Sequence, residues 1–173
     1  MSQPLPPSLT RAQVLSALHD HSTLMSLQPL VTSFEKTPAP ADPDTDPHFS
    51  GSSAPLVYYT IKESIPILPF LGAWGSYPIS FPAIFQDNEE GTKSKALAAM
   101  GVTVRNSWAV RHIEGKGEGD GGQQEWELVE DAEVECPGWL MPFVRGSMEK
   151  AHREMFGGFM DRVMATNAGP QAT

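Results

Sequence analysis

The chain has 173 residues, 40% of them hydrophobic and 19% charged, which is a composition typical of one globular domain with a sizeable core. Its formal net charge is −9 and its 12 Lys and Arg residues are scattered, which argues against nucleic acid and against an anionic membrane surface as partners. No apolar run approaches the roughly 18 residues of a membrane span, and a single cysteine, Cys136, excludes an internal disulfide framework and favours the cytoplasm.

Two short helices are predicted near the N-terminus. Thr10 is a good N-cap for a helix that runs through Leu18, and Asp20 is a good N-cap for a second one. Pro29 ends the second helix, and residues 30–36 follow as a short strand.

The run His19-Asp20-His21 within this region resembles a metal or acid–base cluster. Asp20 is already needed as a helix cap, however, and adjacent histidines point in different directions. We therefore expect no metal and no cofactor.

Two stretches interrupt the regular pattern. Residues 37–54 are rich in Pro, Asp and Ser and predict a long mobile loop, while the glycine-rich residues 115–123 predict a connection between two strands. We expect one domain over residues 9–167, with residues 168–173 forming a disordered tail.

Alternating apolar and polar residues predict the strands of an antiparallel sheet at residues 55–63, 74–87, 92–100, 102–113 and 125–136. Pro78 and Pro82 predict that the second of these is an edge strand or carries a bulge. In the strand 102–113, Val104 and Trp108 share the apolar face, and Arg105 shares the opposite face with other polar residues. We expect that polar face to be in solvent. If the parity were inverted, its arginines would instead become anion anchors in a cavity.

The last element is a predicted helix of about seven turns over residues 138–166, with apolar residues recurring every three or four positions. Gly157 and Gly158 predict a kink or a close approach near its middle. The helix is rich in methionine, which suits either the wall of an irregular pocket or plain core packing.

Three segments resemble the START-like (SRPBCC) helix-grip superfamily, which includes the polyketide cyclases. Residues 18–31 (LHDHSTLMSLQPLV) resemble its paired helices, residues 68–91 followed by 100–113 resemble its central strands, and residues 126–163 resemble its last strand and gripping helix. The chain is also similar to a fungal group within this superfamily, some members of which are associated with secondary metabolism.

The resemblance implies an α+β fold in which a curved antiparallel sheet wraps around a long C-terminal helix. It also implies a cavity for an apolar small molecule. The superfamily begins with a strand before the helix pair, where this chain has only MSQPLPPSL. If that strand is missing, a homodimer becomes possible.

Polar residues on the apolar face of the sheet would face such a cavity and need partners there. We predict Glu130 and His152 as catalytic acid and base, because burial shifts their pKa values in opposite directions. In the alternative interpretation, Glu130 lies in solvent at a strand end and His152 is a half-exposed helix residue. The predicted ligand-binding residues are Tyr59, Tyr77, Phe81, Asn106, Trp108, Met148, Met155 and Phe159.

These residues favour a cofactor-free cyclase, isomerase or dehydratase, and the resemblance implies that it acts on a polyketide-like or terpenoid-like intermediate. Orientation in the cavity and one acid–base pair would supply the catalysis. The alternative is a non-catalytic lipid or metabolite carrier, and a third possibility is an interaction module whose own side chains fill the groove.

Overall fold

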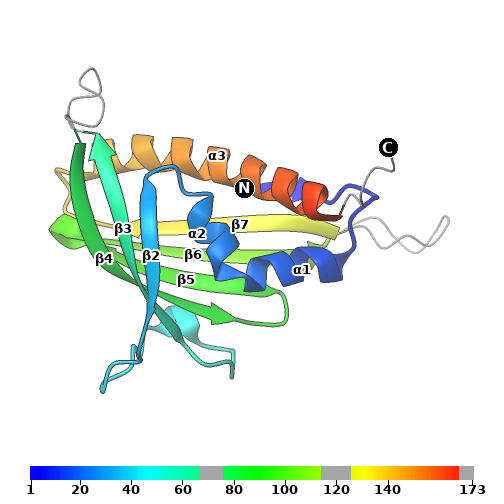
Figure 1. The fold of residues 1–173 in the computed structure, drawn as a ribbon, viewed down its shortest axis with the longest axis horizontal. Helices are drawn as coiled ribbons and strands as arrows, with labels where there is room; N and C mark the ends of the chain where they lie inside the picture. Colours follow the sequence, from blue (N-terminus) through cyan, green and yellow to red (C-terminus); the bar gives the residue numbers. More distant parts are fainter. Residues whose placement is uncertain (67–75, 114–125, 168–173) are drawn as a thin grey trace.

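The computed structural model describes residues 1–66, 76–113 and 126–167, and the predicted glycine-rich connection and C-terminal tail lie outside these ranges. Seven antiparallel strands form one sheet in the order β1-β7-β6-β5-β4-β3-β2 (Figure 1). The strands are β1 (Ser2–Pro4), β2 (Val31–Thr37), β3 (Val57–Pro66), β4 (Ser76–Asp87), β5 (Gly91–Ala98), β6 (Val102–His112) and β7 (Trp126–Glu135).

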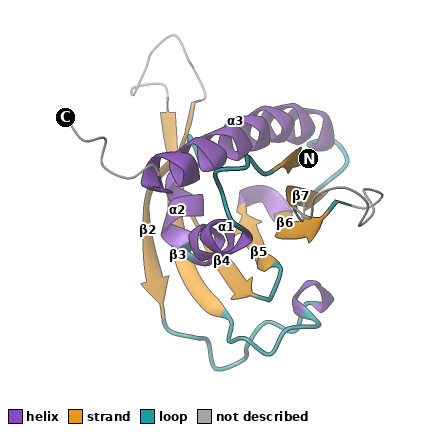
Figure 2. Cartoon of the chain, turned by 90° about the vertical axis from the view of Figure 1, so that its right-hand side faces the viewer, coloured by secondary structure: helices purple, strands orange, loops and turns teal. Residues whose placement is uncertain are grey.

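Three α-helices pack on one face of this sheet. They are α1 (Arg11–His19), α2 (His21–Ser26) and α3 (Met141–Asn167). In the described residues, the short 3₁₀ helices η1 (Pro47–Phe49) and η3 (Ala99–Gly101) lie in loops. Figure 2 shows the strands curving around α3 and the α1–α2 pair. The predicted α+β helix-grip fold is confirmed, and none of the described helices is long and apolar enough to cross a membrane.

The two short helices begin where the sequence predicted. Thr10 and Gln13 form a capping box, in which each side chain accepts a hydrogen bond from the backbone N–H of the other residue. Asp20 caps α2, because its carboxylate accepts from the backbone N–H of Ser22 at 3.1 Å and from the Thr23 hydroxyl at 2.9 Å.

The first strand is present and short. Residues Ser2, Gln3 and Pro4 pair with Val129, Leu128 and Glu127 of β7. Our expectation of a homodimer depended on the absence of this strand, and that premise is wrong.

The prolines of β4 explain why β4 pairs with β5 over only part of its length. β4 lies between β3 and β5, so the prediction of an edge strand is wrong for its second half, residues 83–87, which pairs with both. Pro78 and Pro82 lie in the first half, which pairs with β3 alone. Because proline has no N–H to donate, it is tolerated where one side of the strand is unpaired.

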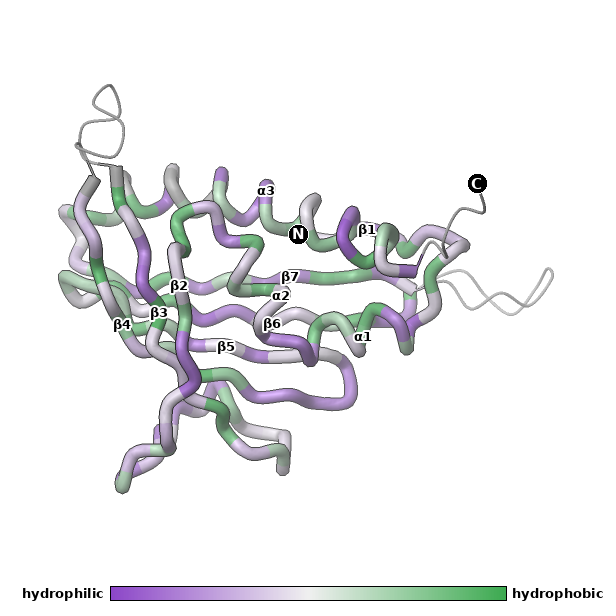
Figure 3. The backbone as a smooth tube through the Cα atoms, in the orientation of Figure 1, coloured by the Kyte–Doolittle hydropathy of each residue, from purple (hydrophilic) through white to green (hydrophobic). Residues whose placement is uncertain are grey.

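The main core lies between the inner face of the sheet and the helices. Trp108 of β6 stacks on Phe156 of α3, with ring centroids 5.5 Å apart, and also contacts Phe159, which is fully buried. Figure 3 shows hydrophobic residues recurring along α3 and along the strands beneath it. Gly158 lies where α3 approaches α2, since a Cβ added there would be 3.2 Å from Leu27.

The outer face of the sheet is partly covered by residues 38–56. Phe49 of η1 packs against Tyr58 and Ile84 in a second small core. Asp46 accepts hydrogen bonds from Arg105 at 2.9 and 3.0 Å, and Lys95 lies 2.7 Å from Asp44 and 3.0 Å from Asp46.

The expectation that Arg105 lies on a freely solvated face is therefore wrong, because this loop covers it. The parity itself was right, so Arg105 does not enter the cavity. The mobility of residues 37–54 stays a prediction.

Candidate functional site

A cavity of about 230 Å³ lies between the inner face of the sheet and α3. Its walls come from α2, from β2 to β6, and from α3, and most of the lining side chains are apolar. Phe81, Trp108, Met148 and Met155, which the sequence predicted as ligand-binding residues, all line it. An uncharged apolar molecule would fill this cavity with little desolvation cost.

His152 contacts Glu130 at the edge of this cavity. Glu130 lies on β7 opposite Trp108 of β6, and His152 stands above it on α3, four residues from both Met148 and Phe156. The Nδ1 atom of His152 is hydrogen-bonded to Oε1 of Glu130. Both residues are buried, with 8% of His152 and 2% of Glu130 exposed, so neither the solvent-exposed Glu130 nor the half-exposed His152 of the alternative interpretation is correct.

This hydrogen bond defines what the imidazole can do. A carboxylate that accepts from Nδ1–H fixes the ring and leaves Nε2 as the basic atom. Among the described residues, nothing forms a hydrogen bond with Nε2 of His152. The ring lines the cavity, so the arrangement suits proton abstraction from a molecule held there.

His152 also borders a second pocket of about 500 Å³ between β7 and α3. Glu130, Ala132 and Val134 contribute the strand side of this pocket, and Met148 and Arg145 contribute to the helix side. Met148 and His152 line both spaces, so the Glu130–His152 pair lies at the boundary between the apolar cavity and a more polar groove.

Glu63 is a cavity residue that the sequence analysis missed. It lies on β3 opposite Ile79 of β4, lines the cavity, and is only partly exposed. Burial raises the pKa of its carboxyl group. The available signal was strand parity, because Glu63 follows Tyr59 and Ile61 at intervals of two and so shares their inward face.

Asn106 lines the same cavity from β6, as predicted. Asn106 is 8% exposed, and among the described residues its buried Oδ1 atom has no hydrogen-bond partner. An unpaired buried polar atom costs free energy, and such atoms in native proteins often mark a function.

The other predicted ligand-binding residues lie elsewhere. Phe159 is completely buried in the core rather than at the cavity wall. Tyr59 is half-buried, and its hydroxyl lies 3.3 Å from Nδ1 of His21. Tyr77 is 60% exposed, because the start of β4 extends with β3 beyond the part of the sheet that β5 joins.

The His19-Asp20-His21 run points in three directions. Nε2 of His19 lies 3.0 Å from the carbonyl oxygen of Gly91, Asp20 caps α2, and Nε2 of His21 lies 3.0 Å from Asp87 while its ring stacks on Phe85. In residues 1–66, 76–113 and 126–167, no group of three or more His, Cys, Asp or Glu side chains is arranged to hold a metal ion.

Comparisons with known proteins agree with this architecture. The crystal structure of TTHA0849 from Thermus thermophilus is similar with a TM-score of 0.53 and 16% sequence identity, over 96% of this chain and 94% of that one. At this identity the likeness supports the fold alone. No curated protein matches the sequence. The family model described as "Domain of unknown function (DUF7053)" matches residues 1–165, and the chain therefore belongs to this family.

Proposed function

We propose that this protein binds an uncharged apolar small molecule between its sheet and α3 and catalyses a cofactor-free proton transfer on it. The main support for this proposal is that His152, oriented by the buried carboxylate of Glu130, lines an apolar cavity. The sequence resemblance suggests a polyketide-like or terpenoid-like intermediate of secondary metabolism as the substrate. A cytoplasmic location, from the single cysteine, belongs to the same proposal.

The reaction would be an isomerisation, cyclisation or dehydration that begins at a carbon next to a carbonyl. Nε2 of His152 takes the proton from that carbon, the C–H electron pair forms a C=C bond, and the carbonyl π pair moves to the oxygen. Glu130 stabilises the imidazolium that results. In an isomerisation the imidazolium returns the proton to another carbon of the enolate. In a cyclisation the enolate carbon forms a bond with a second carbonyl carbon of the same molecule, and the oxygen of that carbonyl takes the proton. In a dehydration the β-hydroxyl group leaves with the proton as water.

The bicyclic ketone 2-tetralone and its hydrocarbon analogue tetralin provide a test of size suited to the cavity. We expect both to shift the NMR signal of the Trp108 indole N–H, and Ala151→Phe to abolish the shift because the larger side chain fills the cavity. We also expect wild-type protein to accelerate the exchange of the tetralone α-protons in D₂O.

His152→Ala should lower this exchange by about 100-fold or more, which is the usual contribution of a general base. His112→Ala is the matched control, because His112 is an exposed imidazole on the same sheet. Exchange that is unchanged in His152→Ala would overturn the catalytic proposal. Failure of both molecules to bind would overturn the ligand site itself.

Non-catalytic binding of a lipid or metabolite is the second candidate, and the predominantly apolar lining of the cavity favours it. A carrier needs the cavity but no base. Binding of tetralin and 2-tetralone without any acceleration of exchange would support this function instead.

A further inference from the structure

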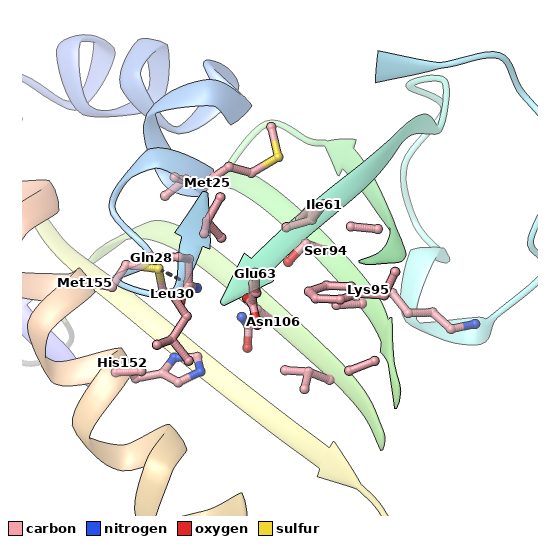
Figure 4. Close-up of a pocket in the computed structure, with 18 of the residues that line it drawn as sticks. Met25, Gln28, Leu30, Ile61, Glu63, Ser94, Lys95, Asn106, His152 and Met155 are labelled. Atoms are coloured by element: carbon pink, nitrogen blue, oxygen red, sulfur yellow. Dashed lines mark hydrogen bonds between the residues drawn. The ribbon is translucent and has the colours of Figure 1, made fainter. Parts of the chain in front are cut away.

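Among the described residues, the cavity is lined by five polar side chains besides His152, namely those of Gln28, Glu63, Ser94, Lys95 and Asn106, and Gln28 donates to the sulfur of Met155. Glu63 and Asn106 enter it from β3 and β6 (Figure 4). Among the described residues, neither side chain forms a hydrogen bond with the protein. Polar side chains that line an apolar cavity indicate a polar atom on the ligand.

The hydrogen-bonding character of these groups can be assigned. Burial raises the pKa of Glu63, which favours the neutral acid, and a neutral acid has an O–H to donate. Oδ1 of Asn106 is enclosed by protein, so its Nδ2 is the end of the amide that remains open to the cavity. Both groups therefore offer a donor.

Among the other described residues of the cavity, none offers a permanent cation to a ligand. Lys95 contributes only its alkyl chain, because its ammonium group turns away toward Asp44 and Asp46 (Figure 4). The imidazole of His152 is balanced by Glu130. Since burying an unpaired anion is costly, a carboxylate or phosphate on the ligand is disfavoured in this cavity.

We propose that Glu63 and Asn106 bind the oxygen of an uncharged ketone or enone ligand, and so select carbonyl compounds for this protein. This inference rests on the proposed function and names its substrate class. The oxygen has two lone pairs, one for the Glu63 O–H and one for the Asn106 N–H.

The same two donors would assist the reaction. When His152 removes the α-proton, negative charge develops on the ligand oxygen, and donors in a water-poor site stabilise that charge more than they stabilise the neutral carbonyl. Glu63 can pass its proton to the oxygen, which leaves an enol and a Glu63 carboxylate. Return of both protons restores the site.

The ratio of the tetralin and 2-tetralone dissociation constants measures this recognition. We expect wild-type protein to prefer 2-tetralone, and Glu63→Leu or Asn106→Leu to reduce the preference by about 3- to 10-fold, the usual value of one hydrogen bond. Glu63→Gln should retain most of it, because its amide also donates. Glu35→Leu, on the outward side of β2, is the matched control.

A pH series separates recognition by the acid from a merely structural role. The wild-type preference should hold at low pH and fall as pH rises through the raised pKa of Glu63, while the Glu63→Gln preference stays constant. The ¹³C signal of labelled tetralone carbonyl should move downfield on binding to wild-type protein and less so on binding to Glu63→Leu.

If wild-type protein binds tetralin and 2-tetralone with equal affinity, this inference is overturned and the proposed function stands. Tighter binding of the anion 2-naphthoate than of 2-tetralone would also overturn it. If neither neutral molecule binds, the proposed function fails together with the inference.

Discussion

Nδ1 of His152 on α3 is hydrogen-bonded to the carboxylate of Glu130 on β7, which lies 22 residues earlier in the chain. The second carboxylate oxygen, Oε2, is buried and has no hydrogen-bond partner in the part of the chain that the structure describes. A buried pair of this kind costs desolvation, and its value for stability is small compared with the cost of removing only one member. The pair is therefore better explained by function than by stability.

This comparison leads to a double-mutant prediction. His152→Leu leaves the Glu130 carboxylate buried alone and should destabilise the protein by about 3 kcal/mol, whereas the double variant with Glu130→Leu should recover most of that loss. Urea denaturation of the two single variants and the double variant measures the coupling. Additive effects of the two substitutions would show that the residues do not interact in solution.

The raised pKa of Glu63 predicts how its variants respond to pH. A group whose pKa is higher in the folded state stabilises the fold below its unfolded pKa, and this contribution is lost as pH rises through the folded value. Relative to Glu63→Gln, wild-type protein should therefore lose stability between pH 4 and pH 8. The midpoints of urea denaturation at pH 4 and pH 8 measure this loss of stability. An equal change of midpoint in wild-type protein and in Glu63→Gln would contradict burial of the Glu63 carboxyl group.

The sequence predicts the features of this site that depend on neighbouring residues, but not the contacts between residues that are far apart in the chain. The alternation around Glu130 and the four-residue spacing around His152 each set a local face, and both predictions of the inward face were right. Their contact depends on how α3 lies along β7, which no local pattern determines. Glu63 was missed because the predicted strand ended there, whereas β3 continues to Pro66.

Residues 38–56, which cover part of the outer face of the sheet, show even more strongly that local sequence does not determine long-range contacts. Their composition predicts little buried surface, yet the single aromatic Phe49 forms the centre of a small core. The ion pair between Asp46 and Arg105 joins residues 59 positions apart. Composition describes the average of a segment, and a few long-range contacts decide where it packs.

Asp46 provides a prediction for this loop. The backbone N–H of His48 and the Arg105 side chain hold the pKa of Asp46 well below its usual value. Asp46→Asn should destabilise the protein by about 1 kcal/mol at pH 7, since most of the charge-assisted bonding is lost.

The sign of the pH effect is opposite to that of Glu63. A lowered folded pKa gives stability that is present above the unfolded pKa and lost as pH falls toward the folded value. The difference in the free energy of unfolding between wild-type protein and Asp46→Asn should therefore become smaller from pH 7 to pH 3, as measured by urea denaturation. A difference that becomes larger at pH 3 would contradict the ion pair.

Gly91 closes the turn between β4 and β5, where Asn88 accepts hydrogen bonds from the backbone N–H groups of Glu90 and Gly91. A Cβ at this position would lie 2.0 Å from the backbone oxygen of Trp108. Gly91→Ala should destabilise the protein by several kcal/mol, on the order of 3, because β5 and β6 must separate. Thermal unfolding measures it, with Gly138→Ala, which meets no atom within 4 Å, as the control.

The glycine pair in α3 separates helix propensity from packing. A Cβ at Gly157 meets nothing within 4 Å, whereas one at Gly158 lies 3.2 Å from Leu27. Alanine is favoured over glycine inside a helix by about 1 kcal/mol, so Gly157→Ala should stabilise the protein by about that amount. Gly158→Ala gains the same propensity but must displace Leu27, so its net gain should be smaller. The two midpoints of urea denaturation compare them directly, and equal gains would show that α3 does not approach α2 as closely as the structure has it.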